Sequence, residues 1–381
     1  MHHKFDHPDI PSPCFVIEQE AIVRNLEILK RLKDKTGIKI LLAQKAFSSW
    51  FFYPLIGKYL DGAAASSLNE ARLAREEMGL EVHSYSPAFN QEQMPEILKN
   101  SDHIVFNSLS QFRRFEKLIN AHLDTHHFFL RVNPGYSAVK NEMYNPVLPG
   151  TRFGVSRFEL DQLPEAITGL HFHALCENNS YDLERTLFSF ERLFADFLPQ
   201  IKFLNIGGGH FITDPEYDFD HLTRLLNQFS ERHKHIELIM EPGAAIALNA
   251  GFLKTSVQDV VQSGGIQTAI IDASITAHMP DCLEMPFQPL INEGEISEKG
   301  PFVYRIGGNS CLSGDFLPPY SFEAELQVGD NIHFLDQIHY TLVKTTFFNG
   351  VDHPALGLLH ENGSFELIKQ FSYEEYKEKL G

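Results

Sequence analysis

The sequence has little cysteine, and its cysteines lie far apart. Only 4 of the 381 residues are cysteines, and no two of them have the Cys-x-x-Cys spacing. A disulfide scaffold and a zinc ribbon are therefore both poor interpretations, because each requires closely spaced cysteines. This usage is typical of a reducing compartment, so we expect a cytoplasmic protein.

Long apolar runs are also missing. None reaches the roughly 18 residues that a membrane-spanning helix requires. The first residues, Met1 to His7, include three histidines and have no apolar core of the kind found in secretory signals. We therefore expect no membrane partner.

Basic residues are scarce relative to acidic ones. The chain has 32 Lys and Arg against 50 Asp and Glu, which gives a formal net charge of −18. Such a field repels nucleic acid and anionic membranes and favours a cationic small molecule. We expect no nucleic-acid partner. The acidity alone does not show whether the protein binds a cationic substrate or only has an acidic surface that keeps it soluble.

The first two thirds of the chain alternate between short apolar segments and longer amphipathic ones. This alternation and its length predict an α/β fold, a (β/α)8 TIM barrel over residues 18–250. The segments between the strands are long enough for helices, for example Asn69 to Met78 and Asp182 to Phe197. Eight strands are predicted, near Ile38–Ala43, Asp61–Ala65, Val82–Tyr85, Ile104–Phe106, Phe128–Val132, Leu170–His173, Phe203–Ile206 and Glu237–Met240.

The remainder of the chain has a different texture, with short apolar runs between turn formers. We predict a mostly β domain, sandwich-like or barrel-like, over residues 251–381, with residues 1–17 adding the strand Cys14–Ile17. Four strands are predicted within the carboxyl-terminal part, at Ile266–Ile271, Phe302–Ile306, Asn331–Leu335 and Tyr340–Phe348.

Lys45 follows the first predicted barrel strand and has apolar neighbours. Barrel enzymes carry their chemistry at the carboxyl ends of the strands. A lysine that loses its hydration there has a lowered pKa and becomes a nucleophile suited to Schiff-base chemistry. A lysine that merely extends to solvent is the alternative interpretation.

His171 and His173 lie two residues apart, so a strand would place them on one face. They could bind a metal, stack on a flat ligand, or be ordinary buried histidines. The sequence offers no HExxH motif and no convincing carboxylate partner, and we predict no metal site.

Three further segments contain groups that could belong to an active site. Gly207, Gly208 and Gly209 follow a predicted strand, where backbone N–H groups can converge on a phosphate. Glu241, before Pro242-Gly243, ends the eighth strand. Cys311 and Asp315 share a loop of small residues that could equally be a plain loop.

Taken together and in this order, these segments resemble the fold-type III pyridoxal-phosphate decarboxylases, the alanine-racemase-like group with ornithine, arginine and diaminopimelate decarboxylases. The resemblance extends from about Pro13 to Phe348. It implies pyridoxal 5'-phosphate as the cofactor. The implied cofactor ligands are Lys45 as the covalent one, His173 stacking on the ring, Gly207, Gly208 and Gly209 at the phosphate, and Glu241 at the pyridine nitrogen.

The same resemblance implies a homodimer with shared active sites, in which the β domain contributes to the partner's site. Cys311 is then the predicted catalytic proton donor, and Asp315 the ligand of a substrate ammonium. Tyr340 is predicted at the cofactor phosphate. We also predict that Glu241 and Asp281 contact the substrate.

Two departures narrow the substrate. Leu312 follows Cys311 where ornithine and diaminopimelate decarboxylases have an acid, and Ala244 follows the Glu-Pro-Gly segment where they have arginine. Three segments are instead similar to carboxynorspermidine/carboxyspermidine decarboxylases, namely His171–Glu177, Ala277–Pro286 and Cys311–Asp315. The resemblance thus predicts decarboxylation of a carboxylated polyamine to norspermidine or spermidine.

Other activities remain open at this point. A decarboxylase of diaminopimelate, ornithine or arginine would share the cofactor residues, and so would an amino-acid racemase. A barrel metallohydrolase would use His171 and His173 on zinc.

Overall fold

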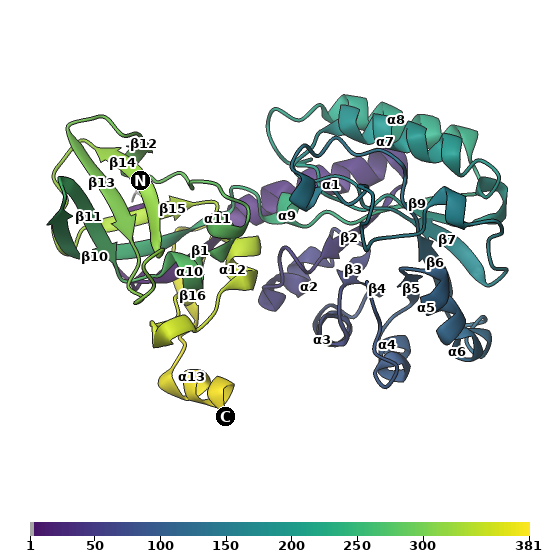
Figure 1. The fold of residues 1–381 in the computed structure, drawn as a ribbon, viewed down its shortest axis with the longest axis horizontal. Helices are drawn as coiled ribbons and strands as arrows, with labels where there is room; N and C mark the ends of the chain where they lie inside the picture. The colour runs from purple at the N-terminus through teal and green to yellow at the C-terminus, as the bar shows by residue number, and fades with distance from the viewer. Residues whose placement is uncertain (1–3) are drawn as a thin grey trace. The chain divides into compact units, whose positions relative to one another are not determined.

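The computed structural model describes residues 4–381, which form two compact units (Figure 1). The barrel unit comprises Asn25–Ile246. The sheet unit combines the amino-terminal segment up to Arg24 with Ala247–Gly381. Within the described residues, no helix is both long enough and apolar enough to cross a membrane.

The predicted (β/α)8 barrel is confirmed. Its eight strands are all parallel, and the last pairs with the first to close the barrel. Every predicted barrel strand is present, within a few residues of its predicted position. The strands are β2 (Lys39–Ala43), β3 (Gly62–Ala65), β4 (Glu81–Ser86), β5 (His103–Phe106), β6 (His127–Arg131), β7 (Ile167–His171), β8 (Phe203–Asn205) and β9 (Glu237–Met240).

Helices lie around these strands, as Figure 1 shows. Local sequence fixes their ends. Ser67 caps the α3 helix by accepting the Glu70 N–H, and Gly79 ends the following π-helical turn in a left-handed conformation with a φ of 69°. The α-helices of the unit are α1 (Gln19–Thr36), which begins before the unit boundary, α2 (Tyr53–Ile56), α3 (Leu68–Leu73), α4 (Met94–Lys99), α5 (Leu109–Arg114), α6 (Glu116–Asn120), α7 (Ser180–Leu193), α8 (Phe219–Arg232) and α9 (Ala244–Ala247).

An apolar layer crosses the inside of the barrel. Leu41, Val105, Phe129 and Ile239 are fully buried and pack as one cluster. Because strand side chains alternate, residues two positions before and after this layer also belong to the inner face. The layer therefore separates the polar residues at the two ends of the barrel.

The sheet unit is built on one nine-stranded sheet. Its strand order is β12-β14-β13-β11-β10-β1-β16-β17, with β15 paired to β10. The predicted strand at Cys14–Ile17 does join this unit, as β1 between β10 and β16. The strands are β1 (Cys14–Glu18), β10 (Gly251–Ser263), β11 (Ile266–Ile271), β12 (Gly294–Ile296), β13 (Phe302–Gly307), β14 (Phe316–Phe322), β15 (Asn331–Leu335), β16 (Ala355–Leu359) and β17 (Phe365–Lys369).

The predicted strand at Tyr340–Phe348 is wrong. Residues Tyr340–Lys344 form helix α12, and a 3-10 turn follows at Phe348–Gly350. The aromatic and β-branched residues favour a strand, but tertiary contacts override that preference. The Lys344 ammonium pairs with Asp281 and Glu284 of helix α11 (Pro280–Glu284), which holds this segment as a helix.

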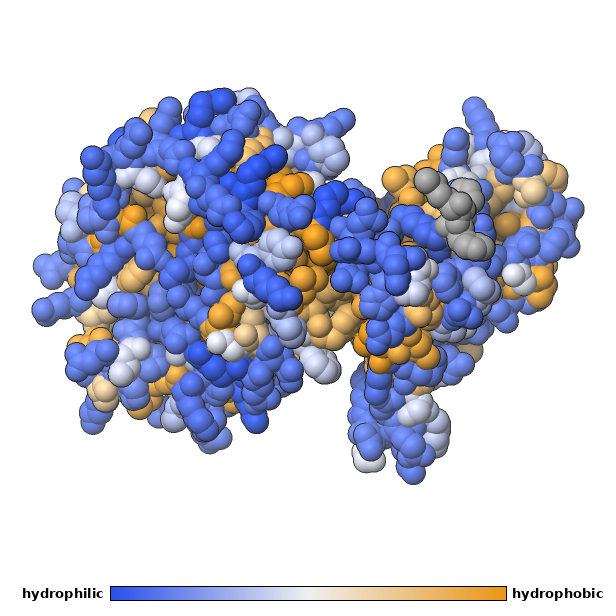
Figure 2. All heavy atoms as spheres, turned by 180° about the vertical axis from the view of Figure 1, so that it is seen from behind, coloured by the Kyte–Doolittle hydropathy of each residue, from blue (hydrophilic) through white to orange (hydrophobic). Residues whose placement is uncertain are grey.

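Strands β10, β12, β14, β16 and β17 were not predicted; in β14, Pro318 and Pro319 disfavour a strand. The neighbouring strand β13 accommodates them at an irregularity between Arg305 and Ile306. Hydrophilic side chains cover most of the face shown in Figure 2, as expected for a chain with a net charge of −18.

Candidate active site

Four of the predicted site segments meet at the carboxyl-terminal end of the barrel. Lys45 follows β2, His173 follows β7, the glycine triplet follows β8 and Glu241 follows β9. Parallel strands in a closed barrel bring their carboxyl ends together, so residues far apart in the sequence become neighbours. We call Lys45, His173, Gly207–Gly209 and Glu241 the barrel cluster.

The Lys45 amine faces the His173 imidazole. Its Nζ lies 3.5 Å from His173 Nε2. His173 Nδ1 accepts the Gly208 N–H at 3.1 Å, so the proton of the neutral ring lies on Nε2 and points to the amine. Desolvation, followed by the Arg131 guanidinium, lowers the pKa of Lys45. The lysine is thereby suited to act as a nucleophile.

The glycine triplet approaches neighbouring backbone more closely than other residues can. A Cβ on Gly208 would lie 2.1 Å from the Glu241 carbonyl oxygen, and one on Gly209 would lie 2.0 Å from the Leu175 carbonyl oxygen. Gly207 and Gly209 also have φ angles of 69° and 93°, in the left-handed region. Only glycine fits this turn. The Gly207 N–H donates to Asn205 Oδ1 at 2.9 Å and the Gly208 N–H to His173 Nδ1 at 3.1 Å, which leaves the Gly209 N–H, among the described residues, without a side-chain acceptor.

Glu241 is held as a carboxylate. Its Oε1 accepts the Asn205 side-chain N–H at 2.6 Å, and its Oε2 lies 3.6 Å from His171 Nε2. Burial alone would raise the pKa of Glu241, but the His171 ring and the Asn205 amide outweigh it and hold that pKa at about 2. A permanently anionic group at this position can keep a ring nitrogen protonated.

Sequence reasoning missed Arg131, the last residue of β6. Its buried guanidinium packs over the rings of Tyr85, at 4.7 Å, and Phe153, at 4.5 Å. It donates to the His173 carbonyl oxygen at 3.3 Å. The rule that identified Lys45 and Glu241, a charged residue at a strand end, would also have identified Arg131.

The remaining predicted site residues belong to the sheet unit. Asp315 is 4% exposed, and its two carboxylate oxygens accept backbone N–H groups from Thr276, at 2.9 Å, and Ser310, at 3.1 Å. Cys311 is exposed, and its N–H donates to Asn349 Oδ1 at 2.7 Å. Asp315 thus organises the loop on which the Cys311 thiol is presented.

Asp281 and Tyr340 lie on two short helices that contact each other. Asp281, buried in α11, accepts a hydrogen bond from the Lys344 ammonium of α12, which also donates to Glu284 at 2.6 Å. Tyr340 begins α12, with its ring centroid 5.8 Å from Lys344 Nζ. These ion pairs join helix α11, which lies in the Ala277–Pro286 segment, to helix α12.

The barrel cluster fits pyridoxal phosphate. The cofactor needs an amine for a covalent bond, a flat neighbour for its ring, N–H donors for its phosphate and an anion for its ring nitrogen. Lys45, His173, the close-packed glycine turn and Glu241 match these four requirements in turn.

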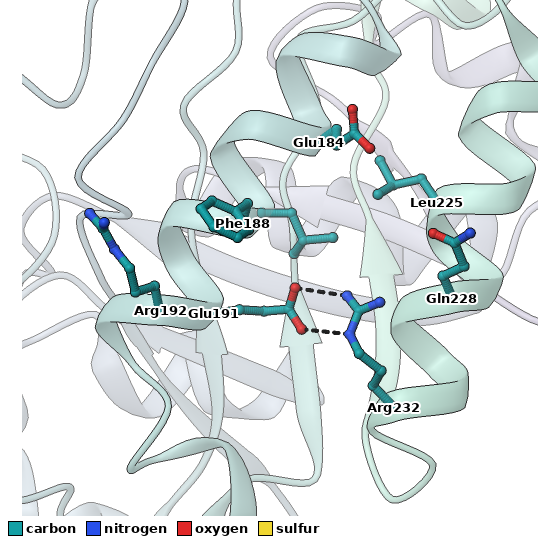
Figure 3. Close-up of a pocket in the computed structure, with 8 residues that line it drawn as sticks. Glu184, Phe188, Glu191, Arg192, Leu225, Gln228 and Arg232 are labelled. Carbon is teal, nitrogen blue, oxygen red and sulfur yellow. Dashed lines mark hydrogen bonds and ion pairs between the residues drawn. The ribbon is translucent and has the colours of Figure 1, made fainter.

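A hollow on the outer side of the barrel does not share these features. It lies between α7 and α8 and is lined by Glu184, Phe188, Glu191, Arg192, Leu225, Gln228 and Arg232 among others (Figure 3). Glu191 and Arg232 form a two-fold ion pair there, at 2.8 and 3.1 Å. None of the predicted site residues lines this hollow.

Comparison with known proteins identifies a family. Residues 14–337 match the family described as pyridoxal-dependent decarboxylase, C-terminal sheet domain. The matched residues include most of both units and all of the barrel cluster.

Individual relatives cover nearly the whole chain. The carboxyaminopropylagmatine decarboxylase of Synechocystis sp. is 48% identical over 374 residues, which are 98% of this chain and 96% of the relative. The carboxynorspermidine/carboxyspermidine decarboxylase of Campylobacter jejuni is 39% identical, over 96% of this chain and 98% of the relative. The crystal structure of carboxynorspermidine decarboxylase from Campylobacter jejuni, complexed with norspermidine, matches with a TM-score of 0.89 and 37% identity, covering 97% of this chain and 100% of that one.

Proposed function

The chain belongs to the family of pyridoxal-dependent decarboxylases, and from this premise we propose that it decarboxylates a polyamine bearing an α-amino acid group. The observation that carries the proposal is the barrel cluster, in which Lys45, His173 and Glu241 have the chemistry the cofactor needs. The predicted substrates are carboxynorspermidine and carboxyspermidine, because relatives named for both are similar over the whole chain.

The comparisons add a third candidate substrate. The relative with 48% identity is named for carboxyaminopropylagmatine, a carboxylated polyamine that ends in a guanidinium group. This identity exceeds the 39% identity with the carboxynorspermidine/carboxyspermidine decarboxylase of Campylobacter jejuni. We therefore place carboxyaminopropylagmatine beside the two predicted substrates.

The barrel residues have distinct proposed roles. Lys45 would hold the cofactor through a covalent bond, which the substrate α-amine would replace. His173 would stack on the ring, and the Gly207–Gly209 turn would hold the phosphate, with the Gly209 N–H as a donor. Glu241 keeps the ring nitrogen protonated, since its low pKa leaves it anionic at neutral pH. When bound, the cofactor supplies an electron sink for the bond to carbon dioxide.

The sheet unit is proposed to complete the site of a second chain in a homodimer. Cys311 is the candidate that protonates the substrate carbon after carbon dioxide leaves, and its exposure permits that role. Tyr340 is the candidate phosphate contact.

Asp315 and Asp281 are the candidate substrate ligands. Asp315 already accepts two backbone N–H groups, and Asp281 already accepts the Lys344 ammonium. A carboxylate has about four acceptor positions, so each can still accept a substrate ammonium.

A direct test is to incubate the cofactor-loaded protein with five substrates separately. These are carboxynorspermidine, carboxyspermidine, carboxyaminopropylagmatine, ornithine and meso-diaminopimelate, with products followed by mass spectrometry. We expect carbon dioxide loss only from the three carboxylated polyamines, and the ratio of kcat/KM values will identify the preferred one. Turnover of ornithine or diaminopimelate alone would contradict the polyamine substrate while leaving the cofactor assignment intact.

A further inference from the structure

A second polar cluster lies at the opposite, amino-terminal end of the barrel. Glu81 begins β4, and His83 follows it on the same face of that strand. His103 begins β5 and is directly opposite His83 in the strand register. One side-chain ligand atom from each of these three residues lies within 4.8 Å of the other two.

The geometry converges on one carboxylate oxygen. His83 Nε2 lies 2.5 Å from Glu81 Oε1, and His103 Nε2 lies 3.6 Å from the same atom. The two imidazole rings are close and tilted, with centroids 3.9 Å apart and an interplanar angle of 32°. Tetrahedral zinc with bonds of about 2.1 Å separates its ligand atoms by about 3.4 Å. Small side-chain rotations would therefore bring the three ligand atoms to the distances that zinc requires.

His103 is left without a hydrogen bond. Its side chain is only 6% exposed, and its Nδ1 is buried with no partner among the described residues. Its Nε2 points toward Glu81 at 3.6 Å, beyond normal hydrogen-bond length. A buried, unpartnered imidazole is costly unless something else binds it.

We propose that Glu81, His83 and His103 form a binding site for a divalent transition metal of the zinc class. Two neutral imidazoles and one carboxylate are a ligand set that such ions prefer, with a fourth position left for water. Glu81 is partly exposed, so the ion can enter from the amino-terminal end of the barrel.

Lys39 competes with the metal for Glu81. Its ammonium lies 3.1 and 2.8 Å from the two Glu81 oxygens and 2.8 Å from Glu237 Oε1. A cation can bind Glu81 when Lys39 moves fully onto Glu237. The proposal therefore predicts opposite effects for variants of neighbouring residues, which a general loss of stability could not produce.

The metal site is separate from the barrel cluster. The buried layer of Leu41, Val105, Phe129 and Ile239 lies between them. The proposal does not depend on the proposed decarboxylation, and the barrel cluster can fail its tests without affecting this one.

The test is zinc titration of the chelator-treated holoenzyme by calorimetry. Bound cofactor occupies Lys45, which prevents zinc from binding there. We expect one zinc ion per chain, and a loss of affinity of at least about 100-fold in His103→Gln and in Glu81→Gln, since even outer-sphere changes cost up to that much. Lys39→Met should bind zinc about tenfold more tightly, because it removes one charge-assisted hydrogen bond to the ligand carboxylate.

Two further variants complete the design. Glu237→Gln should weaken zinc binding, because Lys39 then stays on Glu81. His235→Gln, at an exposed histidine outside the cluster, should leave zinc binding unchanged. Absence of zinc binding in the wild type, its retention in His103→Gln, or weaker binding in Lys39→Met would each overturn the proposal. If His103→Gln does not fold, the zinc affinities of Lys39→Met and Glu237→Gln still test the proposed metal site.

Discussion

The barrel unit and the sheet unit hold their predicted site residues in different ways. In the barrel, topology assembles the site: Lys45, His173 and Glu241 come from three strands and meet only because those strands end at one edge. In the sheet unit, each residue is fixed by its own hydrogen bonds or ion pair: Asp315 accepts backbone N–H groups, and Asp281 is paired with Lys344. The barrel therefore presents several groups to a ligand, whereas the sheet loop presents chiefly Cys311.

Because of this difference, we expect changes in the two units to affect different properties of the protein. A change in the barrel cluster should affect the cofactor within the same chain. A change at Cys311 should affect catalysis without affecting cofactor binding, and in the proposed homodimer the chain it affects is the partner.

The largest effect is expected for Lys45→Ala. Without the amine there is no covalent attachment, so the visible absorbance of the bound cofactor should change and kcat should fall at least about 1,000-fold. Absorbance spectra and carbon dioxide release measure both. The control is Lys58→Ala, at an exposed lysine outside the cluster. Full activity in Lys45→Ala would remove this lysine from the mechanism.

Cys311→Ala should lower kcat by about 100-fold or more, as expected for loss of a proton donor, while cofactor absorbance stays intact. Mixing this variant with Lys45→Ala tests the shared site. Random exchange of subunits makes half of the dimers mixed, each with one complete site, so about a quarter of the wild-type activity should return. If no activity returns after verified subunit exchange, each site is built from a single chain.

Gly208→Ala tests the barrel cluster by changing the backbone of its glycine turn. The added Cβ would lie 2.1 Å from the Glu241 carbonyl oxygen, so the turn proposed to hold the phosphate must shift. Cofactor affinity should fall about tenfold, the equivalent of one hydrogen bond to a charged group. Gly314→Ala in the Cys311 loop is the matched control, because its Cβ would meet nothing within 4 Å. Fluorescence titration of both apo proteins with cofactor measures the difference, and equal affinities would argue against the glycine turn as the phosphate site.

The barrel was predictable because its signals are repetitive. Eight apolar segments alternate with longer amphipathic ones, and each predicted strand is present. The same regularity located Lys45 and Glu241 at strand ends. Arg131 could have been located in this way too, but it lies inside a segment whose apolar residues dominate the pattern.

The sheet unit was less predictable because its structure depends on distant contacts. Tyr340–Lys344 has the composition of a strand and becomes a helix through its pairing with Asp281 and Glu284. Similarly, the cluster of Glu81, His83 and His103 could not be read from spacing, because strand register and not sequence proximity places His103 beside His83. No metal was predicted from His171 and His173, and the cluster proposed here uses neither of them.

The smallest effect tests whether one carboxylate–histidine contact stabilises the sheet unit. Glu293 accepts the His333 N–H at 2.9 Å, and its other oxygen lies 2.6 Å from His333 Nδ1. Burial alone would raise the pKa of Glu293, but the hydrogen bonds from His333 lower it below its ordinary value of 4.5. A lowered folded-state pKa adds stability above the ordinary pKa, and that stability is lost as the pH falls through the folded-state value.

At neutral pH, Glu293→Gln should therefore lower the free energy of unfolding by about 1 kcal/mol. The difference in Tm from the wild type should shrink as the pH falls below 4.5, as thermal unfolding of the apo proteins can show. Glu295→Gln, at an exposed position on β12, is the control, and a Tm difference for Glu293→Gln that does not change with pH would mean that the charge of Glu293 does not stabilise this unit.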